Sequence, residues 1–158
     1  MKSFIKTIML TICALFIFNA CSSKPKIMDV TKVTDREWML TEIKTKPRNI
    51  TLNRNDSESK GFGNSFTLRF DAERLGGVGA PNRYTAPYKI DQDQSIEVKD
   101  IAATLMAPIQ ELTNLKEHEY FAYLQNAYKW HASKGKLELH TKNKDGVKAV
   151  LIYTIVVY

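Results

Sequence analysis

The sequence predicts a mainly antiparallel β protein, in which a small curved or barrel-like sheet carries one packed α-helix. Three observations lead to this fold class. Alternating apolar residues over 65–71 indicate a strand with one buried face. The hydrophobic period becomes that of a helix over about 115–125 and then returns to two. Turn sequences at 133–136 and 143–146 then separate three short apolar segments, as expected for hairpins.

The first half of the chain carries the earlier strands. Residues 35–43 alternate so that Trp38, Leu40 and Ile43 face a core. The alternation over 65–71 is the cleanest in the chain, and it places three residues on one face: Phe66, Leu68 and Phe70. The other segments expected before the helix are a strand at 49–52, an exposed loop at 53–60, a strand at 86–90, a turn at 91–94 and a strand at 95–101.

The expected helix begins with a capping box, in which Asn114 and Glu117 stand three residues apart. Four of its neighbouring apolar residues lie near one stripe at helical spacing: Leu115, Phe121, Leu124 and Tyr128. From Tyr128 onward, a spacing of two places Tyr128, Trp130 and Ala132 on one face of a strand. Strands at 137–140 and 147–157 complete a set of three antiparallel strands.

Residues 76–88 are unusual, because three glycines within four positions precede two prolines. Glycine permits positive φ or close backbone approach, and proline fixes the local path of the main chain. We therefore expect a shaped corner between strands, with Gly79 either at positive φ or in close backbone approach and Asn82 bonded to the turn backbone. Tyr84 and Tyr88 are expected to pack over the core. A phosphate cradle is disfavoured, because the Lys-Ser/Thr pair and the following helix of a P-loop are missing.

The first 20 residues do not belong to the domain. Lys2 and Lys6 precede an almost unbroken apolar run at 8–18, and small residues then lead to Cys21. This is the pattern of a secretory signal peptide, whereas a helix that spans a bilayer needs about 20 apolar residues. The pair Ala20-Cys21 resembles the lipobox of bacterial lipoproteins, which implies that Cys21 is lipidated and becomes the mature N-terminus. An ordinary secreted protein with a free thiol is the alternative.

The resulting organisation is a signal peptide at 1–20, a polar tether at 21–34 and one domain at 35–158. The cysteines are Cys13 and Cys21, so the domain can form neither a disulfide nor a thiolate metal site. Without the signal peptide, 21 basic and 17 acidic residues leave a net charge of +4. The basic residues are scattered along the chain, which is typical of a solvated surface and not of a nucleic-acid site.

No set of residues in the sequence indicates a recognisable reaction. His118, His131 and His140 lack the spacing of a common metal site, and neither a Gly-x-Ser-x-Gly nor a His-Glu-x-x-His motif occurs. No two carboxylates form a recognisable acid/base pair. We therefore expect no catalytic residue, metal or cofactor.

One ligand-binding interpretation stays open, in which Arg83 and Tyr84 contact a molecule at a barrel mouth. Five aromatic residues are expected in the core and at the barrel rim: Tyr120, Phe121, Tyr123, Tyr128 and Trp130.

Four short motifs occur in a fixed order: Trp38-Met39-Leu40, Gly79-Ala80-Pro81-Asn82-Arg83-Tyr84, Tyr88 and Thr104-Leu105-Met106-Ala107. Together they resemble the motifs of the META domain family, the HslJ-like proteins, over about residues 35–155. The resemblance implies a small antiparallel barrel-like fold in exported or lipid-anchored envelope proteins. It also implies structural roles for the motif residues Trp38, Gly79, Asn82, Arg83, Tyr84, Tyr88, Thr104 and Met106. Many members have two cysteines where this chain has Pro81 and Pro108, which fits two positions that lie close together in the fold.

The resemblance further implies a general link to envelope stress, secretion or motility, and it supplies no catalytic residue. The preferred hypothesis is a lipid-anchored protein of the bacterial cell envelope, on the periplasmic side or the cell surface, with an interaction or structural role. Its expected partners are the membrane, through the N-terminal lipid, and an envelope protein, with no nucleic acid.

The alternative is a small barrel that binds an apolar or lipid-like ligand. An enzyme is not expected. A barrel filled by side chains favours the first hypothesis, and an apolar cavity of about 300 Å³ or more favours the second.

Overall fold

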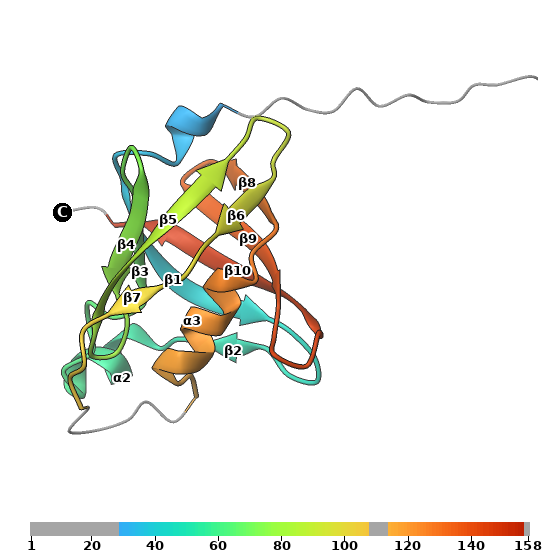
Figure 1. Ribbon diagram of the computed structural model, residues 1–158. Helices are drawn as coiled ribbons and strands as arrows, with labels where there is room; N and C mark the ends of the chain where they lie inside the picture. Colours follow the sequence, from blue (N-terminus) through green and yellow to red (C-terminus); the bar gives the residue numbers. More distant parts are fainter. Residues whose placement is uncertain (1–28, 108–113, 157–158) are drawn as a thin grey trace, which may run out of the picture.

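Ten strands form one antiparallel sheet, which curves into a nearly closed barrel in the computed structural model (Figure 1). The structure describes residues 29–107 and 114–156. Along the sheet the strands follow the order β6-β5-β4-β3-β1-β10-β9-β8, while β2 pairs with β1 and β7 pairs with β5. The strands are β1 (Glu37–Lys44), β2 (Ile50–Thr51), β3 (Thr67–Phe70), β4 (Arg74–Val78), β5 (Arg83–Ile90), β6 (Ile96–Val98), β7 (Ala102–Ala103), β8 (Lys129–Ser133), β9 (Lys136–Lys142) and β10 (Lys148–Ile155). The predicted fold class is confirmed.

The two ends of the strand order meet, and this contact closes most of the barrel. Ser95 and Lys129 form an antiparallel bridge between the start of β6 and the start of β8. Beside it, the Trp130 N–H donates to the Gln94 carbonyl oxygen at 2.9 Å. The helix α3 (Glu117–Gln125) contacts β6 and β9, and in Figure 1 it lies against the side of the barrel.

The core lies inside the barrel and is built from the alternating strand residues. In β1 the predicted inward residues Trp38, Leu40 and Ile43 have 0–1% exposure, and the prediction for this strand is confirmed. Phe66, Leu68 and Phe70 are equally buried, although Phe66 itself has φ +59 and lies just before β3. Complete burial of each large apolar side chain contributes roughly 1.5–3 kcal/mol, so these alternating residues hold the sheet in its curved form.

The predicted helix is confirmed, but it begins differently from the prediction. Its N-cap residue is Lys116, whose N–H donates to the Glu119 carboxylate at 3.1 Å. The predicted cap residue, Asn114, instead donates its side-chain amide to the carbonyl oxygen of Thr51 at 2.9 Å. The capping box at Asn114 and Glu117 is therefore wrong, because both side chains bind other elements.

The buried face of α3 also differs from the predicted stripe. Tyr120, Tyr123 and Leu124 are the buried residues of the helix, while Phe121 is half-buried. Tyr128 lies beyond the helix and is 44% exposed, so it belongs neither to the helical stripe nor to the inward face of β8. Trp130 and Ala132 are buried as predicted. Tyr120 faces the barrel interior, where its hydroxyl meets those of Tyr84 and Tyr153 and the Thr67 carbonyl oxygen.

Residues 53–60 were predicted to be an exposed loop, and this prediction is wrong. They contain the short helix α2 (Arg54–Ser59), which begins after Asn53. The Asn53 side chain accepts the Asn55 N–H at 3.1 Å, as an N-cap residue does. Arg54 fixes the helix to the barrel, since its guanidinium donates to the carbonyl oxygens of three residues: Leu40, Gly63 and Ser65.

The reversal of the chain in the glycine-rich segment is shorter than the predicted corner, because part of the segment belongs to a strand. Gly76 and Gly77 lie within β4, where they pair with Thr85 and Tyr84 of β5. The chain reverses only over residues 79–82, where the Gly79 N–H donates to the Asn82 carbonyl oxygen at 2.6 Å. The glycines in β4 are required by close packing, because a Cβ on Gly77 would lie 2.1 Å from the Thr67 carbonyl oxygen.

Candidate functional site

Asn82 joins three parts of the chain that are far apart in sequence. Its side-chain oxygen accepts from the Thr104 hydroxyl at 2.8 Å and from the Met106 N–H at 2.7 Å. Its side-chain nitrogen donates to the Met106 carbonyl oxygen at 3.1 Å and to the Glu117 carboxylate at 2.7 Å. The residue is 6% exposed. Four of the motif residues therefore meet at one point, namely Gly79, Asn82, Thr104 and Met106.

Glu117 holds the turn between β4 and β5 from the first turn of α3. One carboxylate oxygen accepts the Ala80 N–H at 2.6 Å and the Asn82 N–H at 2.7 Å. These backbone groups would otherwise be free to bind an external anion. Gly79 is not in the left-handed region, so of the two alternatives expected for this glycine, positive φ does not apply. A Cβ on Gly79 would lie 2.4 Å from the same carboxylate oxygen, and this close approach is what requires glycine.

A cluster of three tyrosine hydroxyls lies at the centre of the barrel. Tyr84 donates to the Thr67 carbonyl oxygen at 2.7 Å, and its hydroxyl lies 3.0 Å from that of Tyr120. Tyr153 donates to Tyr120 at 3.3 Å. Burial raises the pKa of Tyr120 to about 12, and it raises the pKa values of Tyr84 and Tyr153 well above the ordinary value. The three hydroxyls are therefore protonated at neutral pH and form a buried network of hydrogen bonds.

The remaining motif residues lie apart from Asn82. Trp38 is buried, and its ring N–H donates to the Val33 carbonyl oxygen at 3.0 Å. The half-buried Tyr88 donates to the Asp71 carbonyl oxygen at 2.7 Å. Arg83 is exposed, whereas its neighbour Tyr84 faces the interior, since successive residues of a strand point to opposite faces. The structure thus separates the two side chains that a ligand at the barrel mouth would need together.

His118 lies on α3, His131 on β8 and His140 on β9. Within residues 29–107 and 114–156, no group of three His, Cys, Asp or Glu side chains has a geometry that could hold a metal ion. No helix in this part of the chain is long and apolar enough to span a membrane.

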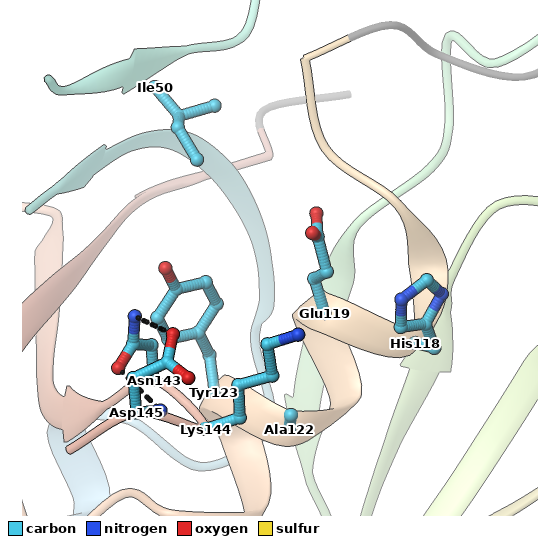
Figure 2. Close-up of a pocket in the computed structure, with 8 residues that line it drawn as sticks. All are labelled: Ile50, His118, Glu119, Ala122, Tyr123, Asn143, Lys144 and Asp145. Carbon is cyan, nitrogen blue, oxygen red and sulfur yellow. Dashed lines mark hydrogen bonds between the residues drawn. The ribbon is translucent and has the colours of Figure 1, made fainter. Parts of the chain in front are cut away.

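A surface groove of about 220 Å³ lies beside α3 (Figure 2). Tyr123, Glu119 and Lys144 extend toward it from the helix and from the turn between β9 and β10. Burial raises the pKa of Tyr123, and the charges of Glu119 and Asp145 act in the same direction. Asn143 shapes the turn by accepting the Asp145 N–H at 2.9 Å. The full lining is Ile50, His118, Glu119, Ala122, Tyr123, Asn143, Lys144 and Asp145.

The family model of the META domain matches residues 31–151 of the chain. The chain belongs to the META domain family. The expectation drawn from the four sequence motifs is thereby confirmed. Asn82 and the segment at 104–106, which come from two of these motifs, are joined directly in this META domain.

Two solved structures show the same fold as this META domain. An NMR structure of a protein from Burkholderia xenovorans superimposes with a TM-score of 0.59 at 15% identity, over 82% of this chain and 87% of the other. A crystal structure of a DUF4847-family protein from Bacteroides vulgatus gives a TM-score of 0.53 at 14% identity, over 79% of this chain and 95% of the other. A comparison with curated proteins finds no match.

The roles of several residues of the site could not be predicted from the sequence. The sequence predicts Glu117 as a capping residue of the helix and Tyr153 only as part of a final strand. A buried tyrosine needs a hydrogen-bond partner for its hydroxyl, so the sequence could indicate that Tyr120 and Tyr153 would have one. It could not indicate which residues these partners are. Of the two prolines at the family's cysteine positions, Pro81 lies in the turn held by Glu117, and Pro108 lies outside the described residues.

Proposed function

We propose that this META domain is a lipid-anchored protein of the bacterial cell envelope. It would be held in the membrane through Cys21 and would act by binding an envelope protein on its outer surface, in stress response, secretion or motility. The filled barrel is the observation that supports this proposal. The hydroxyls of Tyr84, Tyr120 and Tyr153 meet in the buried interior, which a ligand-binding barrel would keep open as a cavity.

The length of the N-terminal segment supports membrane attachment close to the domain. Residues 1–20 have the pattern of a signal peptide, and Cys21 stands at its end. The described domain begins at Asp29, so the eight steps of chain from Cys21 can span at most about 29 Å. A lipid on Cys21 would therefore keep the domain next to the bilayer surface.

The proposal assigns no reaction to the domain. Its buried tyrosines are held in the neutral form, and the Glu117 carboxylate is already bound to the backbone of the turn. The alternative of an apolar ligand inside the barrel receives less support, because Trp38, Trp130 and Tyr120 are among the large side chains that occupy the interior.

The anchor is tested by replacing Cys21. The Cys21→Ala variant should move from the detergent fraction to the soluble fraction and should lack the mass of a lipid. Cys13→Ala is the matched control, because this cysteine lies within the signal peptide and should leave both properties unchanged. Unaltered partitioning and mass of Cys21→Ala would contradict the proposal.

The partner is tested by photo-crosslinking in the native envelope, with the crosslinker at one of three surface positions. Ala122 samples the groove beside α3, Arg83 samples β5, and Lys129 samples β8. A protein bound to one face should give one discrete adduct at one or two of these positions. Absence of any adduct at all three positions would count against an interaction role.

A further inference from the structure

A basic pocket lies at the end of the barrel where the described chain begins. We use this name for the pocket lined by the four basic residues Lys32, Arg36, Lys134 and Lys136. Its volume is about 150 Å³, and Trp38, Ala132, Ser133 and Gly135 complete the lining. Nothing in the family motifs or in the proposed function accounts for this gathering of charge.

The pocket is made by three segments that the fold holds together. Lys32 ends the short 3₁₀ helix η1 (Val30–Lys32), and Arg36 immediately precedes β1. Lys134 and Gly135 form the two-residue turn between β8 and β9, with φ +50 and +76. This turn type matches the twist of the two strands, so it presents Lys134 and Lys136 in a fixed arrangement.

Two hydrogen bonds fix these segments to the barrel. The Ile155 N–H donates to the Gly135 carbonyl oxygen at 3.2 Å, which holds the turn against the end of β10. The Trp38 ring N–H donates to the Val33 carbonyl oxygen, which holds the chain after η1 against β1. The backbone segments that carry the four basic residues are therefore held in place by the scaffold before any ligand arrives.

The charge of the pocket is largely uncompensated. No acidic residue lines it, and among its four basic residues Lys136 alone forms an ion pair within the described part of the chain, with Glu138 at 2.7 Å. Lys32, Arg36 and Lys134 form no ion pair with the residues that the structure describes. Two exposed cations outside the pocket do have carboxylate partners, namely Arg69 with Asp71 and Lys89 with Asp91. Like charges held close together repel each other, so a bound anion would relieve this repulsion.

We infer that the basic pocket binds a phosphate group. An arginine fork and lysine ammonium groups are the donors that phosphate oxygens prefer, and Ser133 adds a hydroxyl. The pocket is smaller than the roughly 300–1,000 Å³ of sites for drug-sized ligands, which suits a small oxyanion. The phosphate belongs either to the headgroup of an anionic phospholipid or to a free phosphate compound. This inference does not depend on lipidation at Cys21.

Calorimetric titration of the full chain in non-ionic detergent tests the inference and separates the two sources. One arm uses inorganic phosphate and pyrophosphate. The other uses dihexanoyl phosphatidylglycerol, with dihexanoyl phosphatidylcholine as its neutral counterpart. The double variant Arg36→Gln/Lys134→Gln should weaken binding about tenfold, because two charge-assisted contacts are lost. Both side chains are exposed, so the variant should keep the wild-type circular dichroism spectrum.

The matched control is Arg69→Gln/Lys89→Gln, which removes the same charge from residues outside the pocket. Binding of phosphate or pyrophosphate that only the pocket variant weakens supports a free phosphate compound. The same pattern with phosphatidylglycerol alone supports a lipid headgroup. Absence of binding in both arms, or equal weakening by the two double variants, would overturn the inference.

Discussion

Asn82 and Glu117 show how single residues determine the shape of the turn between β4 and β5. The sequence indicated that Asn82 would satisfy polar groups near the turn, since asparagine commonly does so. It could not indicate that the partners would be Thr104, Met106 and Glu117, because these lie 22 to 35 residues away. The sequence shows that a side chain must donate or accept hydrogen bonds. Which distant residue serves as its partner depends on the complete fold.

Removal of either residue should destabilise the domain. Asn82→Ala leaves the Met106 N–H and carbonyl oxygen without their partner, and Glu117→Ala leaves two backbone N–H groups of the turn unpaired. These groups are partly buried and the penalty for an unsatisfied buried group is about 1–3 kcal/mol, so each variant should lose up to about that free energy of unfolding. Urea denaturation measures the loss. Glu97→Ala, at an exposed position of β6, is the control and should stay within about 0.5 kcal/mol of wild type.

Gly77 and Gly79 should respond differently to replacement by alanine. A Cβ at Gly77 meets the backbone of Thr67 in the neighbouring strand, so the sheet itself must move, at a cost of about 3 kcal/mol or more. A Cβ at Gly79 meets only the Glu117 carboxylate, so the cost should be the loss of that contact, about 1–3 kcal/mol. In a Glu117→Ala background, Gly79→Ala should become nearly neutral, while Gly77→Ala should stay costly. Equal costs in both backgrounds would contradict this explanation.

At the scale of elements, strands were predicted more accurately than helices. A strand with one buried face reveals itself through alternation, as in β1 and β3, and the turn at 143–146 separates β9 from β10 as predicted. The short helix α2 was missed because its polar residues give no apolar stripe. Arg54 supplies its attachment instead, by binding the Leu40, Gly63 and Ser65 carbonyl oxygens. A helix that one long charged side chain attaches to the barrel does not need apolar residues at helical spacing, so the sequence does not reveal it.

The tyrosines that join β5, α3 and β10 should make the domain sensitive to alkaline pH. Tyr84, Tyr120 and Tyr153 stay protonated in the folded domain at a pH where unfolded tyrosine, with a pKa of about 10, ionises. The folded state then binds more protons, so stability is unaffected below about pH 10 and falls toward pH 12. Each tyrosine contributes a slope of about 1.4 kcal/mol per pH unit.

Urea denaturation at several pH values above pH 9 measures this slope. Tyr153→Phe removes one ionising group together with a single hydrogen bond of 3.3 Å, so the slope should fall by about one third. Tyr128→Phe is the control, because Tyr128 lies at the surface and takes no part in the cluster. A slope that Tyr153→Phe leaves unchanged would exclude the buried cluster as its origin.

At the scale of the whole molecule, the barrel-like class was predictable and the strand order was not. Local alternation and turn residues indicate that neighbouring segments pair, as β9 does with β10. They give no information on the pairing of β1 with β10, which joins Trp38 to Ile155 and Lys44 to Val150. This pairing depends on how the curved sheet packs around its shared core, and the sequence contains no short-range signal for that.

The stability of the domain should be independent of redox conditions. The cysteines of the chain are Cys13 and Cys21, and both precede the described domain, which begins at Asp29. The melting temperature should therefore be the same with and without dithiothreitol, since the core and the hydrogen bonds carry the stability. A shift of several degrees on reduction would reveal an intermolecular disulfide that contributes to folding.

The position of β10 between β1 and β9 has a consequence for biosynthesis. A ribosome makes residues 148–155 long after β1, so β1 has no partner on that side until β10 has been made. Pairing between such distant segments is also slow to form. The sheet therefore cannot be completed while the chain is still being made up to β10. The strand order thus delays completion of the sheet until β10 has been synthesised.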